Sequence, residues 1–235
     1  MKLTIYIPTF RRVELEACLE SIIPQLVEGV EVIISDNDPD GFAKEIASKY
    51  PRAKYTRRYF NIEGDPNVVR GLACGSGEYV WVFGDDDTML PGTIKALIPM
   101  LDGVDRVIHW SPNSLETNPG FHGQMSDYIQ SLDDKSILVA STLITANVWR
   151  RAVMNIPLGL EKVDTKYPLF WAGLGCETVK VMPHPTITVG HVHTNVFGFF
   201  NKVIDEYLKA LMAHHKLPKI NVLSAMRWNF VNVSL

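Results

Sequence analysis

The sequence is poor in cysteine and has no long apolar run. Its three cysteines lie far apart without a CxxC spacing, which argues against a disulfide framework and a zinc site. No apolar stretch is long enough to cross a membrane. The strand expected from Leu3 leaves no room for a secretory signal peptide. These absences predict a cytoplasmic protein with reduced thiols and no transmembrane segment.

Excess positive charge and glycine-rich phosphate loops are also missing. The chain has 23 Lys and Arg against 26 Asp and Glu, a net charge of −3, so electrostatics favours neither nucleic acid nor an acidic membrane as a partner. Neither a Gly-x-Gly-x-x-Gly nor a Walker A loop follows the first expected strand. A nucleotide bound here would therefore need a metal ion to hold its phosphates.

Alternating strands and helices are the main pattern of the first 101 residues. With 235 residues, 46% of them apolar, the chain can bury the core of one large domain. Apolar runs and helical spacing predict strands at 3–7, 30–34, 54–59 and 79–83, and helices at 15–26, 42–49, 67–74 and from Pro91. This order predicts an α/β fold with a mostly parallel, nucleotide-binding sheet flanked by helices.

The pattern changes after residue 102. Strands are expected at 106–110, 178–182 and 186–189, a loop at 111–123, and an amphipathic helix at 199–214. This helix and the apolar tail pack on the core, form a homodimer interface or touch a membrane surface, and the sequence leaves these alternatives open.

Three adjacent carboxylates, Asp85-Asp86-Asp87, follow the strand 79–83 after a single glycine. Adjacent carboxylates repel each other, and a divalent cation that prefers hard oxygen ligands removes the repulsion. The alternative is a solvated acidic turn before a helix. Because ligands bind at the carboxyl ends of strands in open α/β sheets, the triplet is a candidate metal site for a nucleotide diphosphate.

Polar residues end two further strands on the same expected edge. Thr9 can offer its hydroxyl to a base, and Asp36 can accept a base N–H, although an Asx turn would also explain Asp36. Farther along, His191 and His193 alternate, so a strand would point both rings to one face. A metal site is one reason for this spacing and a structural role is the other.

The ordered set Pro8-Thr9-Phe10-Arg11, Asp36-Asn37, Asn61, Gly64, 67–72 and 77–87 resembles family 2 glycosyltransferases of the GT-A fold over about residues 3–101. The resemblance implies inverting transfer of a sugar from a nucleotide-sugar, a UDP-sugar being favoured, with Mn²⁺ or Mg²⁺ bridging the diphosphate. The implied donor-binding residues are Pro8, Thr9, Arg11, Asp36, Asn67, Arg70, Asp85 and Asp86.

Within this set the resemblance also implies separate roles. Thr9 and Asp36 would contact the base, Asp85 the ribose or sugar, and Asp86 would lie near the diphosphate. Asp87 would be the main metal ligand, joined by His191 or His193. Arg70 also fits a solvated helix residue.

The family's catalytic base, often in a Glu-Asp pair of the second half, has no clear match. Asp164 is the favoured candidate and Glu161 the alternative, although Asp164 also fits a helix N-cap. The missing pair leaves a silent nucleotide-sugar or glycan-binding module open. A nucleotidyltransferase would need glycines after the first strand, and these are absent.

The resemblance divides the chain into a nucleotide-sugar-binding half (1–101), an acceptor-binding half of the same domain (102–198) and a C-terminal helix and tail (199–235). The acceptor is left open among a glycan, a lipid-linked sugar, a protein and a modified base. We expect a cytoplasmic protein, with peripheral association at a membrane as the alternative.

Overall fold

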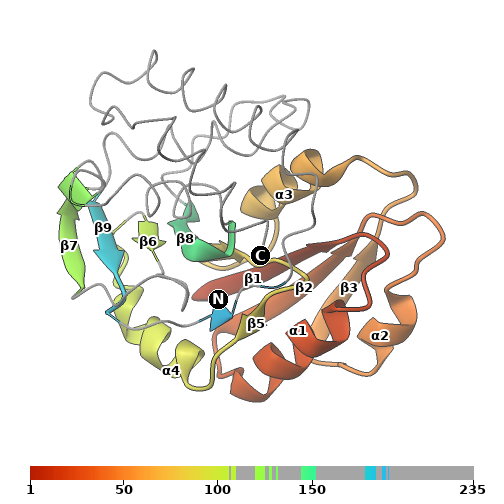
Figure 1. Ribbon diagram of the computed structural model, residues 1–235, viewed down its shortest axis with the longest axis horizontal. Coiled ribbons are helices and arrows are strands. Elements are labelled where there is room, and N and C mark those ends of the chain that lie inside the picture. The colour runs from red at the N-terminus through yellow and green to blue at the C-terminus, as the bar shows by residue number, and fades with distance from the viewer. Residues whose placement is uncertain are drawn as a thin grey trace, which may run out of the picture.

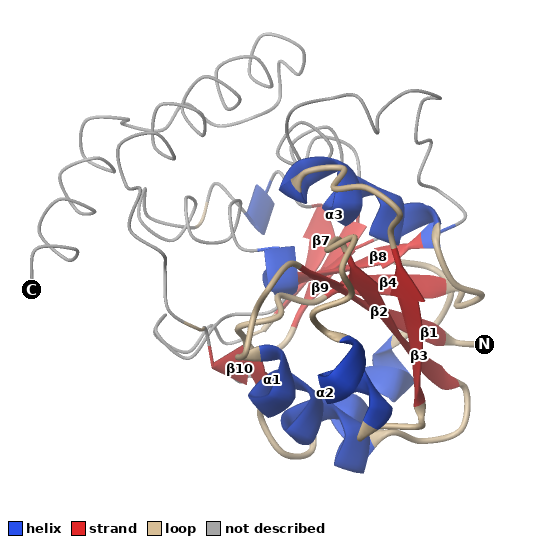
Figure 2. Ribbon diagram, turned by 90° about the vertical axis from the view of Figure 1, so that its right-hand side faces the viewer, coloured by secondary structure: helices blue, strands red, loops and turns tan. Residues whose placement is uncertain are grey.

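The computed structural model describes residues 1–105, 107–109, 120–124, 127–128, 131, 144–151, 178–183, 187–188 and 190. In this part of the chain, α3 covers one face of the sheet and α1 and α2 cover the other (Figures 1 and 2). The elements are β1 (Leu3–Thr9), α1 (Leu15–Ile22), η1 (Ile23–Gln25), β2 (Val30–Asp36), α2 (Lys44–Ser48), β3 (Ala53–Arg57), α3 (Gly64–Ala73), β4 (Tyr79–Val82), β5 (Thr88–Met89), α4 (Thr93–Leu97), η2 (Ile98–Met100), β6 (Val107–His109), β7 (Phe121–Gln124), η3 (Ile144–Ala146), β8 (Asn147–Arg150), β9 (Thr178–Val181) and β10 (Ile187–Thr188).

The first half of the sheet is parallel, as predicted. Its strand order is β3-β2-β1-β4, and the register pairs Thr9 with Asp36 and Tyr6 with Val82. The carboxyl ends of β1, β2 and β4 therefore meet at one edge, which confirms the α/β fold class and the common edge of the three motifs.

The second half of the sheet is mixed. The antiparallel strand β8 lies beside β4, and β6, β9 and β7 continue the sheet. The loop predicted at 111–123 was wrong at its end, because β7 begins at Phe121. Pairing with β9 makes this polar, glycine-containing segment a strand, and side-chain periodicity carries little information about such pairing.

Strict alternation along the parallel strands builds two cores. Leu3, Ile5 and Ile7 lie in the larger core together with residues of α1 and α4. The second core combines Leu72 of α3 with strand side chains of the opposite parity, namely Tyr6, Ile33, Val80 and Val82. A strand buried on both faces in this way reads as a continuous apolar run, which is why the sequence revealed these strands.

Glycine and proline set several helix boundaries. The helix expected at 15–26 leaves α-geometry after Ile22, and Pro24 lies in the 3₁₀ turn that follows. The helix expected at 67–74 begins earlier, at Gly64, and Pro66 fits its first turn because that turn needs no intrahelical N–H. The helix expected from Pro91 begins at Thr93, because Gly92 adopts a φ of 84° before it.

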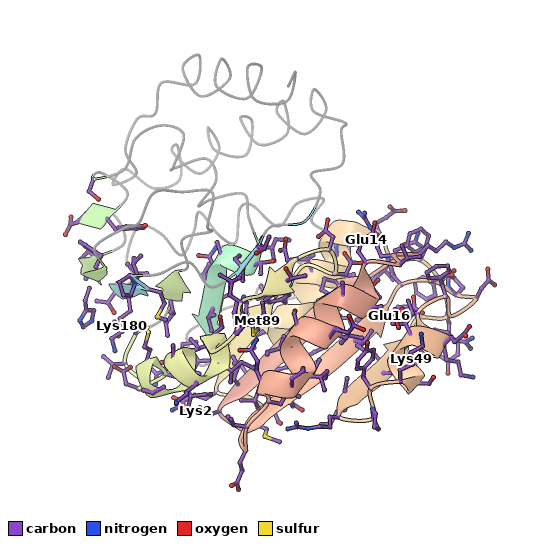
Figure 3. The ribbon with its side chains drawn as sticks, turned by 60° about the horizontal axis from the view of Figure 1, so that its bottom comes forward. Lys2, Glu14, Glu16, Lys49, Met89 and Lys180 are labelled. Carbon is purple, nitrogen blue, oxygen red and sulfur yellow. The ribbon has the colours of Figure 1, made fainter. Side chains whose placement is uncertain are left out.

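Helices α1 and α2 lie side by side on one face, where Lys49, just after α2, forms a 2.7 Å ion pair with Glu16 of α1 (Figure 3). Buried Met89 of β5 packs beside α1 in the same view, and its N–H donates to the Ser21 hydroxyl at 2.9 Å. Strand β5 follows the acidic triplet and pairs antiparallel with β10. This ladder brings Gly190, just after β10, to the triplet.

Candidate functional site

A cavity of about 520 Å³ opens where the carboxyl ends of β1, β2 and β4 meet the start of α3. Its lining joins segments that are far apart in the sequence: Pro8, Thr9, Phe10, Arg12, Asn37, Asn61, Glu63, Gly64, Asn67, Val68, Gly84, Asp85, Asp86 and Ile144. The structure therefore brings together five of the predicted donor residues. Arg11, Asp36 and Arg70, also predicted, do not line this cavity, and neither does Asp87, the predicted metal ligand.

Two carboxylates of the acidic triplet, Asp85 and Asp87, are incompletely solvated. Burial raises the pKa of Asp85 to about 6, and the neighbouring charge of Asp86 adds to the rise. The hydroxyl of Thr9 opposes this rise, although it forms no hydrogen bond of normal geometry within the described residues. Burial also raises the pKa of Asp87. The loop thus concentrates carboxylates whose charge the nearby protein groups compensate incompletely.

Asp87 is held by two groups from the second half of the chain. Its Oδ2 accepts a short hydrogen bond from the Thr145 hydroxyl, and its Oδ1 accepts one from the Gly190 N–H at 2.9 Å. A Cβ at Gly190 would lie 1.9 Å from the Asp86 carbonyl oxygen, so only glycine fits there. Neither Thr145 nor Gly190 was predicted from the sequence, although His191 and His193, close to Gly190, were predicted as metal ligands.

Asp36 uses its carboxylate inside the fold. Its Oδ1 accepts the N–H of Asp38 at 3.0 Å, and its Oδ2 accepts the Ala43 N–H at 3.0 Å and the Tyr55 hydroxyl at 2.8 Å. These bonds close the loop between β2 and α2, as in the Asx turn that the sequence allowed. Contact between Asp36 and a base stays a prediction.

The wall opposite the triplet is fixed by asparagines. The Asn37 amide donates to Asn61 Oδ1 at 2.6 Å and to the Glu63 carbonyl at 3.1 Å, and its Oδ1 accepts the Ile62 N–H at 3.0 Å. These bonds hold Glu63 at a φ of 69°, a backbone conformation that is uncommon outside glycine. The wall is therefore preorganised, although no individual role for these residues was predicted from the sequence.

Asn67, at the base of the cavity, ties α3 to the sheet. Its Oδ1 accepts from the Tyr6 and Ser35 hydroxyls, both at 2.9 Å, and its amide donates to the Ser35 carbonyl at 3.2 Å. These contacts explain its burial without a ligand. Its predicted contact with a donor stays a prediction.

The two arginines that were predicted to bind the donor lie outside the cavity. Arg11 forms ion pairs with Asp38 at 3.1 Å and Asp40 at 3.0 Å, and Arg70 is exposed in the last turn of α3. The neighbouring Arg12 does line the cavity, although no role was predicted for it from the sequence.

The donor set at the triplet suits a hard divalent cation. It consists of carboxylate oxygens, and none of its members forms an ion pair with Lys or Arg within the described ranges. No cluster of three or more metal-ligating side chains is assembled among those residues. The other predicted metal and catalytic residues, His191, His193, Asp164 and Glu161, lie outside the described residues.

The order of strands and the placement of the cavity define the class of the protein. The fold is an α/β fold of the GT-A type, and solved structures confirm it. The structure of S. aureus TarS 1–349 in complex with UDP-GlcNAc is 14% identical, with a TM-score of 0.65, over 90% of this chain and 66% of that one. The mannosyltransferase PcManGT from Pyrobaculum calidifontis, in complex with GDP-Man and Mn²⁺, is 13% identical, with a TM-score of 0.62, over 96% and 68%.

Sequence comparison gives the family. Residues 4–138 match Glycosyl transferase family 2, so the chain belongs to this family. A Campylobacter jejuni protein, the GalNAc(5)-diNAcBac-PP-undecaprenol β-1,3-glucosyltransferase, is 33% identical over 103 residues, which is 41% of this chain. The chain spans about a third of the length of this relative, since the match covers 33% of it.

Proposed function

We propose that this chain transfers a sugar from a nucleotide-sugar, with a UDP-sugar favoured, to an acceptor hydroxyl with inversion, and that it uses Mn²⁺ or Mg²⁺. One observation carries the proposal: a single cavity is lined by Thr9 at the end of β1 and by Asp85 and Asp86 after β4, and the buried hydroxyl of Thr9 has no hydrogen bond of normal geometry among the described residues. A buried polar atom without a partner is costly unless a ligand completes its hydrogen bonding.

The base would lie against the Thr9 hydroxyl, on the wall that Asn37 and Asn61 hold in place. A preformed wall lowers the entropy lost when the nucleotide binds. Asp36 would contribute chiefly by fixing the β2–α2 loop beside this wall. Asp85 would contact the ribose or the donor sugar.

Asp87, together with Asp85 or Asp86, would hold the cation, and His191 or His193 would complete its ligands. When bound, a divalent cation stabilises the negative charge of the departing nucleoside diphosphate. Asp164, or else Glu161, would take the proton from the acceptor hydroxyl, which attacks the anomeric carbon on the side opposite the leaving diphosphate. That attack inverts the configuration.

A lipid-linked sugar is the acceptor class we favour, because the Campylobacter relative is named for an undecaprenol-linked substrate. No helix in the described ranges is long and apolar enough to span a bilayer. Membrane contact would instead be peripheral and would use Tyr59 and Phe60, which are 90% and 69% exposed beside the exposed Arg57. They precede the segment that forms the cavity wall.

The membrane contact is tested by sedimentation with vesicles of phosphatidylglycerol and phosphatidylcholine. The double variant Tyr59→Ser, Phe60→Ser should lose vesicle binding. The control Val104→Ser, at a residue that is 68% exposed elsewhere on the surface, should keep it. Equal binding by both variants would contradict this surface.

The transfer itself is tested by the thermal stability of the protein with a panel of nucleoside diphosphates, with and without Mn²⁺, and by release of nucleoside diphosphate from nucleotide-sugars. We expect UDP with Mn²⁺ to raise the melting temperature, because a ligand that binds only the native state stabilises it. If no uridine, guanosine, cytidine or thymidine diphosphate shifts the melting temperature, the donor assignment is wrong. Tight binding without turnover on any acceptor would instead identify a silent binding module.

A further inference from the structure

Thr145, in η3, contacts both ends of the acidic loop. It is only 1% exposed. Its hydroxyl donates to Asp87 Oδ2 and accepts the N–H of Gly84 at 2.8 Å. Its carbonyl accepts the indole N–H of Trp81 at 2.9 Å, which anchors η3 to β4. One residue of the second half thus fixes the loop that carries the triplet.

The direction of these hydrogen bonds follows from their chemistry. The Gly84 N–H can only donate, so the Thr145 oxygen must accept that bond. The single proton of the hydroxyl is then left for the Asp87 carboxylate. Because the Gly190 N–H holds the other carboxylate oxygen at 2.9 Å, both oxygens of Asp87 are oriented, and each keeps lone-pair capacity for a further partner.

We propose that Thr145 is a positioning residue for the metal site, which presents the Asp87 carboxylate to the cation in a fixed orientation. The inference rests on the proposed function, since it concerns the cation that the triplet would hold. It assigns a part of the metal site to the half of the chain, 102–198, that is expected to bind the acceptor.

Substitution by valine removes the hydroxyl and keeps nearly the same shape. Thr145→Val leaves one Asp87 oxygen and the Gly84 N–H without their partner, so the carboxylate is free to turn. Loss of such an outer-shell partner typically weakens metal binding by about 10–100-fold. Thr145→Ser keeps the hydroxyl and should restore most of the affinity.

Thr4 offers a matched control at the other end of the sheet. Its fully buried hydroxyl also donates to a carboxylate, Glu31, at 2.8 Å and accepts a glycine N–H, that of Gly77, at 2.9 Å. Thr4→Val therefore removes the same pair of hydrogen bonds far from the triplet. Both valine variants should lower the urea midpoint, and only Thr145→Val should change metal affinity.

The test is a titration of Mn²⁺ into each protein in the presence of UDP, with free Mn²⁺ measured by electron paramagnetic resonance. Each variant is first shown to be folded by circular dichroism. We expect at least a tenfold weaker Mn²⁺ affinity for Thr145→Val, and near-native affinity for Thr145→Ser and Thr4→Val.

If wild-type protein binds Mn²⁺ and Thr145→Val binds it equally well, the positioning role is refuted and the proposed function stands. The role is also refuted if Thr145→Ser is as weak as Thr145→Val, or if Thr4→Val is equally weak. If wild-type protein binds no Mn²⁺, the positioning role falls together with the use of Mn²⁺ in the proposed function.

Discussion

Glu31 makes the stability of this protein depend on pH in a way that can be calculated. It lies on β2 and is 5% exposed. Its Oε1 accepts from the Thr4 hydroxyl at 2.8 Å and from both the N–H and the hydroxyl of Ser76, at 2.5 and 2.8 Å. Its Oε2 accepts from Lys54 at 2.7 Å. Burial alone would raise the pKa of Glu31, but these donors outweigh it and lower the pKa from 4.5 to about 2.

The sign follows from this depression. Glu31 takes up a proton near pH 4.5 in the unfolded chain and near pH 2 in the folded chain. Between these two pH values, acidification therefore favours the unfolded state. The stability contributed by Glu31 is present above about pH 4.5 and is lost as the pH falls toward 2. Linkage between these two pKa values gives a loss of about 2 kcal/mol between pH 7 and pH 3. This is an upper figure, because Lys54 is 66% exposed and solvent screens its charge.

The assay is urea unfolding of wild-type protein and Glu31→Gln at pH 7, 4 and 3. Other carboxylates affect both proteins equally, so the difference between them isolates Glu31. Glu31→Gln should be the less stable protein at pH 7, and the gap should shrink by about 2 kcal/mol at pH 3. A gap that stays constant with pH would refute the assignment of a depressed pKa to Glu31.

Further substitutions test how α3 is held on the sheet. Gly71→Ala should destabilise the protein by about 1–3 kcal/mol in urea unfolding, because its Cβ would lie 2.4 Å from the Tyr6 ring. Gly64→Ala, with no atom within 4 Å of the new Cβ, should be neutral or stabilising; equal losses would contradict close packing at Gly71. Arg151→Lys should lower stability by about 2 kcal/mol, because its guanidinium donates to three backbone carbonyls at the end of α3 and in the turn before β4, at 2.8, 3.1 and 2.5 Å. Arg52 is the exposed comparison, with only two such bonds, at 3.4 and 3.0 Å. Arg52→Lys should therefore cost less, and similar midpoints for the two lysine variants would argue against the anchor at Arg151.

The sequence was sufficient to predict the strands whose side chains are buried on both faces of the sheet. The strands at Leu3–Thr9 and Val30–Asp36 read as apolar runs because both of their faces are covered. Short strands escaped the same reasoning. Thr88–Met89 has two residues, and Phe121–Gln124 is half polar, so only their partners in the sheet define them.

The candidate site was predictable where its residues follow strands and unpredictable where they meet across the chain. Thr9 and the triplet stand at strand ends, so the parallel topology alone brings them to one edge. Thr145 and Gly190 contact Asp87 across 58 and 103 positions, and no local pattern encodes those contacts. For Asp36, the position at the end of a strand was predictable from the sequence. The hydrogen bonds that its carboxylate accepts within the β2–α2 loop became evident only from the structure.

Calorimetric titration of UDP, with and without Mn²⁺, into wild-type protein and Asp87→Asn tests most directly whether the triplet is a metal site for a nucleotide diphosphate. Asp102→Asn is the control for charge, since Asp102 pairs with Lys180 away from the cavity. Mn²⁺ should tighten UDP binding at least tenfold in wild-type protein and in Asp102→Asn, and should have little effect in Asp87→Asn. Equal enhancement in Asp87→Asn, or none in wild-type protein, would contradict the metal site at the triplet.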